Sequence, residues 1–579
     1  MSNNVKHPKG LYVLFFTEMW ERFGYYLMLG IFSLYMLDSV ESGGMGFDKS
    51  TKSDIYGTYL GLVYLTPFIG GLIADRILGY RKSIIIGGIL MALGYFGLSI
   101  TGNLPIFYLS LLFIILGNGF FKPNISVLVG NLYNNDELKH KKDAGYNIFY
   151  MGINIGSFFC NIVAAVLYIV YGWWAAFLAA GVGMTIGIII FMRGTKHIRH
   201  VDVIKPAPAG SMPIWKVLSY VLLPAFAFGI LGYFLMGVNP DNEVGKGNIF
   251  GSDSNDAFLF GCIPVVVFYV LLLMKSPAEE KRPVGALLAV FFAVIVFWAV
   301  FHQNGDALTT WAEEYSDKEY PASVAGVADK MKLVFHAKYD ETTTMTDVEF
   351  KEFLAPLEAK QKELKKTNPL KAKEVSKEID NYTKSRAYYK NLPKERWPKK
   401  GESLPLATAN LYQSINPAWV VLLTPLIVGL FAFLRRKGRE PSTPTKIAFG
   451  LLITGLSALV MVAAANGTNL DKEKASTWWL IGSYGVITIG ELFLSPMGLS
   501  LVSKLSPTRI TALMMGGWFL STSIGNKLAG IMSSWWEQYD IKSKGDFFWM
   551  NFYCCLGAFL LMAVMLKWLI GVMKEKGVN

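Results

Sequence analysis

The sequence predicts an all-α membrane protein, because it combines few charges with many long apolar runs. Hydrophobic residues make up 53% of the 579 positions and charged residues only 17%, against about 25% in ordinary soluble domains. Runs of about twenty apolar residues, the length that a spanning helix needs, recur along the chain. The net charge of +12 is spread over separate loops and does not form the basic face that nucleic-acid binding requires. We therefore expect a lipid bilayer, and no nucleic acid, as a partner.

Fourteen apolar runs predict fourteen spanning helices in groups of six, two and six. The first group lies near 11–37, 55–78, 83–101, 105–131, 144–170 and 172–192, the second near 214–237 and 257–274, and the third near 284–310, 416–434, 446–466, 477–502, 510–533 and 547–572. This order predicts a first six-helix bundle over 1–200, two additional helices with linkers over 201–282, and a second six-helix bundle formed by 283–311 and 406–579.

Basic residues occur in every second loop, which predicts how the chain lies in the membrane. The clusters are Lys6 and Lys9; Arg76, Arg81 and Lys82; Lys139, Lys141 and Lys142; Arg193, Lys196 and Arg199; Lys275, Lys281 and Arg282; Arg435, Arg436, Lys437 and Arg439; and Lys574 and Lys576. The short loops between them, such as 101–104 and 171–173, carry almost no charge. By the positive-inside rule, we expect both termini in the cytoplasm.

Residues 312–405, which we call the insert, interrupt the apolar pattern. They hold 19 Lys and Arg and 17 Asp and Glu, so we expect a soluble segment, and the alternation of the loops places it outside. The stretch 348–389 is rich in Lys, Glu, Leu and Ala and predicts two helices interrupted near Asn368 and Pro369. A solvated helical hairpin is one interpretation, and a module that docks a partner is the other.

Ionisable side chains inside spanning helices are costly and are therefore candidates for function. Of three such residues in the first predicted helix, Glu18 and Arg22 are four apart and share a face, whereas Glu21 and Arg22 are neighbours and point in different directions. One of the two acids then lacks a partner and can bind a proton reversibly, as proton coupling requires. Static ion pairs that specify helix packing are the alternative. The same buried polar set includes Lys122, His302, Asp306 and Glu491.

Four segments carry a resemblance to known families. The run GGLIADRILGYRK at 70–82 resembles the cytoplasmic loop signature of the major facilitator superfamily. The runs EMWERFGYY at 18–26, FKPN at 121–124 and FYMGINIG at 149–156 resemble motifs of the proton-dependent oligopeptide transporter family. The two additional helices match bacterial members of that family. The resemblance covers nearly the whole chain outside the insert and implies the major facilitator fold.

The resemblance implies a proton-coupled symporter that imports di- and tripeptides by alternating access across a bacterial inner membrane. The proton gradient would drive it, and no cofactor, metal ion or enzymatic activity is implied. The peptide would lie at the bilayer midplane between the two bundles. Arg22 and Lys122 would pair with its carboxylate, whereas its ammonium end and backbone would be held by Glu491, Asn154 and Asn416. The aromatic positions lining the pocket would be Tyr25, Tyr26, Tyr64, Trp298 and Trp518.

Simpler roles are open for several of these residues. Each aromatic side chain could serve helix packing alone, and Asn154 or Asn416 alone could form an interhelical hydrogen bond. The functional alternatives are a related carrier for another small anion or peptide-like compound, and a non-transporting membrane receptor that uses the insert. An enzyme is not expected, because the sequence shows no nucleophile–base pairing and no cluster of metal ligands.

Two positions depart from the family pattern. Leu29 stands where the family usually has Arg, and His302 where it usually has an acid, so the salt bridge that usually joins the bundles near the outer gate is missing. Asp306 follows His302 by one helical turn, and we expect the two to pair, which would favour the charged form of the histidine. The outer gate would then be held by apolar contacts. A neutral His302 bonded to a neighbouring helix is the alternative.

Overall fold

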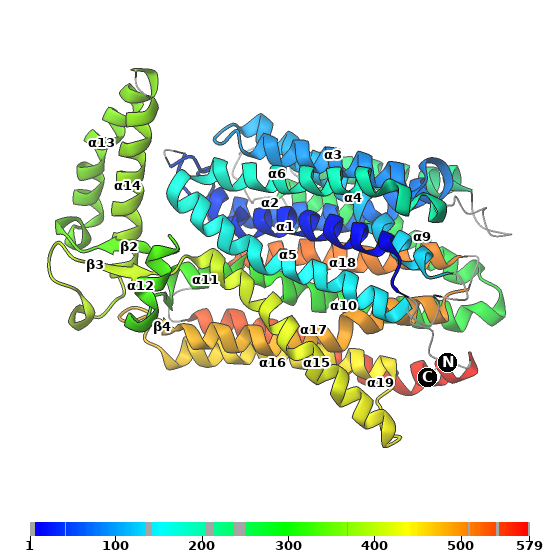
Figure 1. Ribbon diagram of the computed structural model, residues 1–579. Helices are drawn as coiled ribbons and strands as arrows, with labels where there is room; N and C mark the ends of the chain where they lie inside the picture. The colour runs from blue at the N-terminus through cyan, green and yellow to red at the C-terminus, as the bar shows by residue number, and fades with distance from the viewer. Residues whose placement is uncertain are drawn as a thin grey trace.

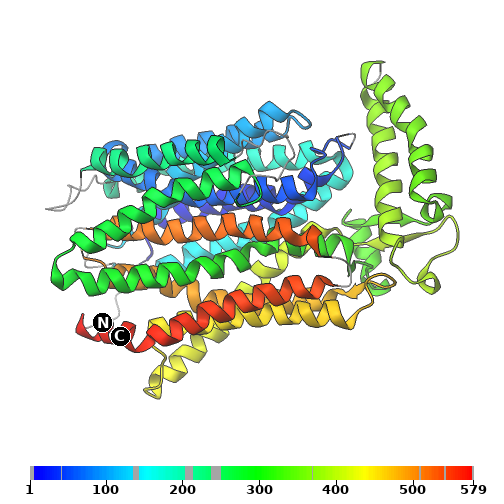
Figure 2. The same ribbon diagram turned by 180° about the vertical axis from the view of Figure 1, so that it is seen from behind.

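The computed structural model describes residues 6–40, 42–134, 138, 142–202, 213–236, 249–367, 369–507, 510–539 and 543–576. Figure 1 shows a long bundle of helices lying side by side, with a smaller helical body across one end. Figure 2 shows from behind that both ends of the chain lie at the opposite end of the bundle. Lys139 and Lys141 of one predicted basic loop, and Asn368 of the predicted hairpin, lie outside the described residues.

The first six long helices share one apolar core. They are α1 (Lys9–Leu37), α2 (Lys49–Ile73), α3 (Tyr80–Leu98), α4 (Leu104–Leu132), α5 (Lys142–Tyr171) and α6 (Trp173–Gly194). Their buried apolar side chains form one cluster that draws on all six. Glycines permit the closest approaches: a Cβ built on Gly87 of α3 would lie 2.5 Å from the carbonyl oxygen of Gly117 in α4.

The last six long helices form a second body with its own core. They are α10 (Ala278–Phe301), α15 (Ile415–Arg436), α16 (Thr443–Gly467), α17 (Thr477–Leu505), α18 (Thr511–Ser534) and α19 (Lys544–Glu575). The second cluster of buried apolar side chains comes mainly from α10, α16–α19 and α9 (Asp253–Lys275). Between the two bodies in sequence, α9 packs against α8 (Leu223–Met236), which follows α7 (Ile214–Val217) and the π-helical turn η5 (Leu218–Leu222).

The fourteen predicted spans correspond to helices in the part of the chain that the structure describes. Eleven helices there are long and apolar enough to cross a membrane; α1, α8 and α18 fall outside that group, and α8 is only 14 residues long. The predicted span 284–310 is interrupted. α10 ends at Phe301, and the 3-10 turn η6 (His302–Gly305) separates it from α11 (Ala307–Glu314). The predicted site residues His302 and Asp306 therefore lie outside α10.

The insert folds into a small helical body with short strands. Its helices are α12 (Ala322–Lys330), α13 (Asp347–Thr367) and α14 (Pro369–Tyr389), with 3-10 turns η7 (Glu341–Thr344) and η8 (Lys394–Arg396). Strand β2 (Phe335–Lys338) pairs antiparallel with β3 (Ser403–Leu406), and β1 (Ser316–Asp317) pairs in parallel with β4 (Ala475–Ser476), which immediately precedes α17. The predicted hairpin is formed by α13 and α14, which stand across the direction of the long helices (Figure 1).

The two bundles approach each other very closely where α2 crosses α18. A Cβ built on Gly530 would lie 2.5 Å from the carbonyl oxygen of Ser53 and 2.7 Å from the Cα of Gly57, so the crossing leaves no room for a side chain. One turn farther along, Ser523 Oγ donates a hydrogen bond of 2.6 Å to the carbonyl oxygen of Gly61. This crossing lies in the half of the bundle nearer the insert, which we call the insert end.

Candidate functional site

Glu18, Glu21 and Arg22 lie buried in the middle of α1, with at most 3% of each residue's surface exposed. Arg22 Nη2 donates a hydrogen bond of 2.7 Å to Glu21 Oε1, and its Nε donates to the other oxygen of Glu21. The prediction that Glu21 and Arg22 point in different directions is therefore wrong. Their Cβ atoms diverge, but the long arginine side chain folds back over its neighbour and engages both carboxylate oxygens.

Glu18 is the less fully paired of the two acids. Its Oε1 lies 3.1 Å from Arg22 Nε, so the expected pair four residues apart is present. Its Oε2 is buried and has no hydrogen-bond partner among the described residues. A buried carboxylate oxygen without a hydrogen-bond donor is costly when it is charged. Glu18 should therefore bind a proton more readily than Glu21.

A second cation stands near this cluster. Lys122 of α4 places its Nζ 3.9 Å from the ring centre of Tyr64 in α2, and it interacts electrostatically with the charged residues of α1. The Arg22 guanidinium lies 5.0 Å from the ring centre of Tyr25. The first bundle therefore gathers two cations against aromatic faces, an arrangement that suits an anionic ligand group.

Glu491 of α17 supplies the opposite charge from the second bundle. Asn416 at the start of α15 donates its amide to Glu491 Oε2 at 3.2 Å and to Thr488 Oγ1 at 2.9 Å. Among the described residues, no Lys or Arg lies within ion-pair distance of Glu491. Asn416 thus orients a carboxylate that no cation of the described residues neutralises, as a site for an ammonium group requires.

Two tyrosines connect the poles of opposite charge. Tyr26 of α1 interacts electrostatically with both Arg22 and Glu491. Tyr64 of α2 does the same. Each of these tyrosines therefore lies within electrostatic range of a predicted cation of the first bundle and of the predicted acid of the second.

The other predicted pocket residues differ in their surroundings. Trp298 of α10 lies 6.5 Å from Tyr64, ring centre to ring centre, across the two bundles, and its indole nitrogen has no partner among the described residues. Trp518 of α18 is buried against Gly498 of α17, where a Cβ would overlap its indole ring. These contacts favour the packing role for Trp518 and a lining role for Trp298.

The contacts of Tyr25 and Asn154 do not distinguish a role in lining the pocket from a role in helix packing. Tyr25 is 1% exposed, and its hydroxyl has no partner among the described residues. Asn154 of α5 is half-buried and donates its amide to the carbonyl oxygen of Tyr150 at 3.0 Å, one turn back on its own helix. That bond is not interhelical, so it does not support the packing role weighed for Asn154.

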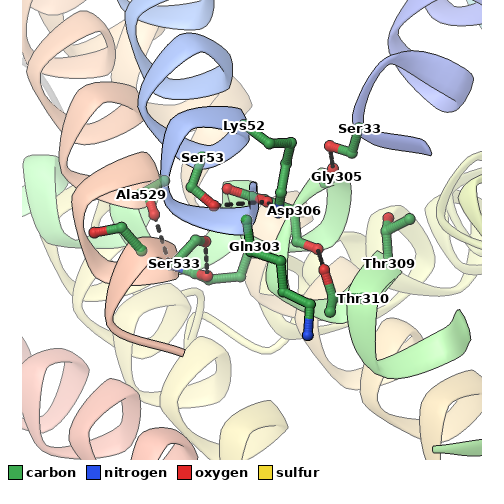
Figure 3. A network of polar contacts seen from close by, with 12 residues as sticks. Ser33, Lys52, Ser53, Gln303, Gly305, Asp306, Thr309, Thr310, Ala529 and Ser533 are labelled. Carbon is green, nitrogen blue, oxygen red and sulfur yellow. Dashed lines mark hydrogen bonds and ion pairs between the residues drawn. The ribbon is translucent and has the colours of Figure 1, made fainter. Parts of the chain in front are cut away.

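The predicted pair between His302 and Asp306 is not formed. Because α10 ends at Phe301, the two residues do not share an α-helical face. His302 Nδ1 instead lies 3.3 Å from the carbonyl oxygen of Trp298, in the last turn of α10. Asp306 Oδ1 forms an ion pair with Lys52 of α2 and accepts a hydrogen bond of 3.2 Å from Ser53 Oγ (Figure 3).

Two ion pairs join the bundles at the insert end, one fully and one partly buried, so apolar contacts are not all that holds the bundles together there. One is Lys52–Asp306, and the other joins Lys527 Nζ of α18 to Asp54 Oδ1 of α2 at 2.6 Å. Lys527 could have been recognised from the sequence as a candidate, since it is a charged residue inside the predicted span 510–533. Lys52 lies in the first turn of α2, outside the apolar run, so it does not stand out as a charge within a predicted span.

No group of three or more His, Cys, Asp or Glu side chains within the described ranges could hold a metal ion.

Comparison with known proteins identifies the family. The sequence profile of the POT family matches residues 81–320 and 406–550. The chain belongs to the POT family. A di-/tripeptide transporter of Lactococcus lactis subsp. lactis is 29% identical over 524 residues, covering 89% of this chain and 87% of the relative. Dipeptide and tripeptide permease A of Escherichia coli is 26% identical over 538 residues, covering 92% and 86%.

A solved POT structure supports the same assignment. The crystal structure of a peptide transporter POT in complex with sulfate aligns with a TM-score of 0.72 and 26% identity, covering 98% of this chain and 96% of that one. The predicted family and fold class are therefore confirmed, and the chain is a multi-span membrane protein of a family of transporters, not of enzymes. Residues 321–405, most of the insert, lie outside the match to the POT profile.

Proposed function

We propose that this POT family member is a proton-coupled symporter that imports di- and tripeptides by alternating access across a bacterial inner membrane. Both termini lie in the cytoplasm, and the insert end faces outside. The observation that carries the proposal is the pair of opposite poles, Arg22 with Lys122 in one bundle and Glu491 in the other. A peptide zwitterion carries the complementary charges at its two ends and can contact both bundles at once.

The charged cluster of α1 (Glu18, Glu21 and Arg22) couples peptide binding to proton binding. With both acids ionised, Glu18 and Glu21 more than neutralise Arg22, which disfavours a second carboxylate at the same cation. A proton on Glu18 removes one negative charge beside Arg22, so the peptide carboxylate competes with one carboxylate, Glu21, for the guanidinium and no longer with two. Proton and peptide therefore favour each other's binding, which is a coupling free energy between two sites.

Aromatic lining explains how one site accepts many side chains. Tyr26, Tyr64 and Trp298 present large apolar faces with polar tips, and such groups contact varied ligands without demanding one shape. The fixed charges recognise only the peptide ends, which all di- and tripeptides share. No cofactor has a role in this scheme, since the proton gradient supplies the free energy.

Uptake of labelled dialanine into proteoliposomes tests the proposal. We expect accumulation with an inward proton gradient and only equilibration without one. Unlabelled dipeptides should compete, whereas single amino acids and nitrate should not. Competition by nitrate but not by peptides would instead establish a carrier of small anions, and binding without any uptake would establish a receptor.

A further inference from the structure

The insert is built rigidly onto the second bundle. It leaves that bundle through α11 and returns to it through β3 and the 3-10 turn η9 (Ala409–Ser414). Strand β1 pairs with β4 of the loop before α17, and Thr477 Oγ1 donates a hydrogen bond to the carbonyl oxygen of Asp317. Lys474 Nζ in that loop donates to the carbonyl oxygen of Glu314 at 2.7 Å, and Asn391 Nδ2 donates to that of Leu470 at 3.1 Å. The insert therefore moves with the second bundle.

The same insert also packs on the first bundle. Ala165 of α5 is fully buried in an apolar cluster with Ala328, Leu333 and Val334 of the insert. At the end of α5, the carbonyl oxygen of Val170 accepts a hydrogen bond of 2.6 Å from Lys377 Nζ of α14. These contacts tie the insert to a helix of the opposite bundle.

Charged side chains also link the insert to the first bundle, at two further points. Lys49 at the start of α2 forms an ion pair of 2.6 Å with Glu314. Lys384 of α14 lies 6.0 Å from the ring centre of Trp173, whose indole nitrogen donates to Asp38 at 2.6 Å. Burial opposes the charge of Lys384, but Asp380 of the insert and Asp38 of the first bundle together raise its pKa above the ordinary range.

From these contacts we propose that the insert is a clasp: it holds the outer ends of the two bundles together, and it must release α5 each time the transporter opens to the outside. The proposal rests on the proposed function, since only alternating access requires the outer ends to separate. Because the insert is fixed to the second bundle by strand pairing, separation breaks its contacts with Ala165, Val170 and Lys49. Breaking these contacts costs free energy whether or not a ligand is bound, and the insert residues that contact α5 lie in 321–405, which the family profile does not match.

A reversible cross-link tests the clasp directly. The four native cysteines are first replaced, and cysteine pairs are introduced at Ala165 with Ala328 and at Ala165 with Val334. Each linked protein should lose gradient-driven dialanine uptake at least tenfold and regain it on reduction. The matched control links Lys338 to Ser403, which are paired across β2 and β3 and exposed within the insert. That link should leave uptake unchanged.

The outcomes separate the clasp from the proposed function. Full uptake by a completely linked α5 variant would overturn the clasp, because the insert would then not need to leave the first bundle. Absence of peptide uptake by the same variant before linking and after reduction, and by the cysteine-free parent, would overturn the transport function itself.

A weakened clasp gives a second readout. Ser33 near the outer end of α1 is 2% exposed and donates to the carbonyl oxygen of Gly305 across the bundles, so a Ser33→Cys reporter is reached only when the outer ends separate. Leu333→Ser should speed its labelling by a membrane-impermeant thiol reagent severalfold. Val348→Ser, at an exposed position of the insert, should not. Equal labelling in both variants would contradict the clasp.

Discussion

Lys52 of α2 and Asp306, in the turn after α10, form an ion pair that joins the two bundles while both side chains are at most 2% exposed. Ser53 Oγ donates to the same carboxylate oxygen at 3.2 Å, and Asp306 Oδ2 has no partner among the described residues. Around it, Gln303 Nε2 bonds to the carbonyl oxygen of Ala529 at 3.3 Å, and Ser33 bonds to Gly305 (Figure 3). The contact between the bundles at the insert end thus depends on charges that cannot be hydrated while it persists.

Removing one partner of this pair should be far more harmful than removing both. Asp306→Asn leaves the Lys52 ammonium buried without a counter-charge, and such a change costs about 3–5 kcal/mol. Replacing the pair by Lys52→Met with Asp306→Leu should be close to neutral, because an apolar pair needs no desolvation of charge. Thermal unfolding of the three proteins in detergent measures the difference. Equal loss in the single and the double variant would show that the pair is not energetically coupled.

Neutralising Glu18 and neutralising Glu21 should impair transport in different ways. Glu18→Gln removes the proposed proton site but leaves the contact between Glu21 and Arg22, so gradient-driven accumulation should disappear while peptide-for-peptide exchange continues. Glu21→Gln also disturbs the orientation of Arg22, so exchange should weaken as well. Paired assays of accumulation and exchange in proteoliposomes distinguish them. Undiminished accumulation by Glu18→Gln would assign the proton to another group.

Glu491→Gln should discriminate between peptides by their amino ends. A hydrogen bond to a charged group contributes about 1.5–3 kcal/mol, so binding of peptides with a free amino terminus should weaken roughly ten- to a hundredfold. Amino-acetylated peptides lack the ammonium group and should lose little. Competition curves for matched free and acetylated dipeptides provide the measurement, and the same loss for both would remove Glu491 from the ammonium site.

Gly530→Ala should push α2 and α18 apart at their crossing. The new methyl group would meet backbone atoms of Ser53 and Gly57, which cannot rotate away, and overpacking of this kind costs about 1–3 kcal/mol. Gly557→Ala in α19 is the matched control, since a Cβ there meets nothing within 4 Å. The thermal unfolding temperature should fall in the first variant only; a fall in neither would mean that the helices adjust without cost.

Lys474 should make stability depend on pH above neutrality. Burial, with Lys318 nearby, lowers the pKa of Lys474 to about 7, whereas an unfolded lysine titrates near 10.4. Between these values the unfolded chain holds a proton that the folded protein has released, so stability should rise with pH, by at most about 1.4 kcal/mol per unit. Lys474→Met should abolish this rise, and Lys472→Met at an exposed position two residues earlier should keep it. Parallel curves for the parent and Lys474→Met would contradict the prediction.

The sequence by itself determined where the long apolar helices, the charge-rich insert and the charged cluster of α1 lie, and it predicted the six-two-six order of the spans. These features are local, because the transfer of a helix into a bilayer depends on the residues of that segment alone, and a charge in an apolar run is visible without its neighbours. The tertiary structure alone decided the partners. Asp306 pairs with Lys52, 254 positions away, and not with the histidine four residues before it, because the helix ends between them. Arg22 folds onto Glu21, Trp518 packs on Gly498, and the insert reaches α5. Each of these contacts depends on where helices end and how they rotate against one another, which no single segment encodes.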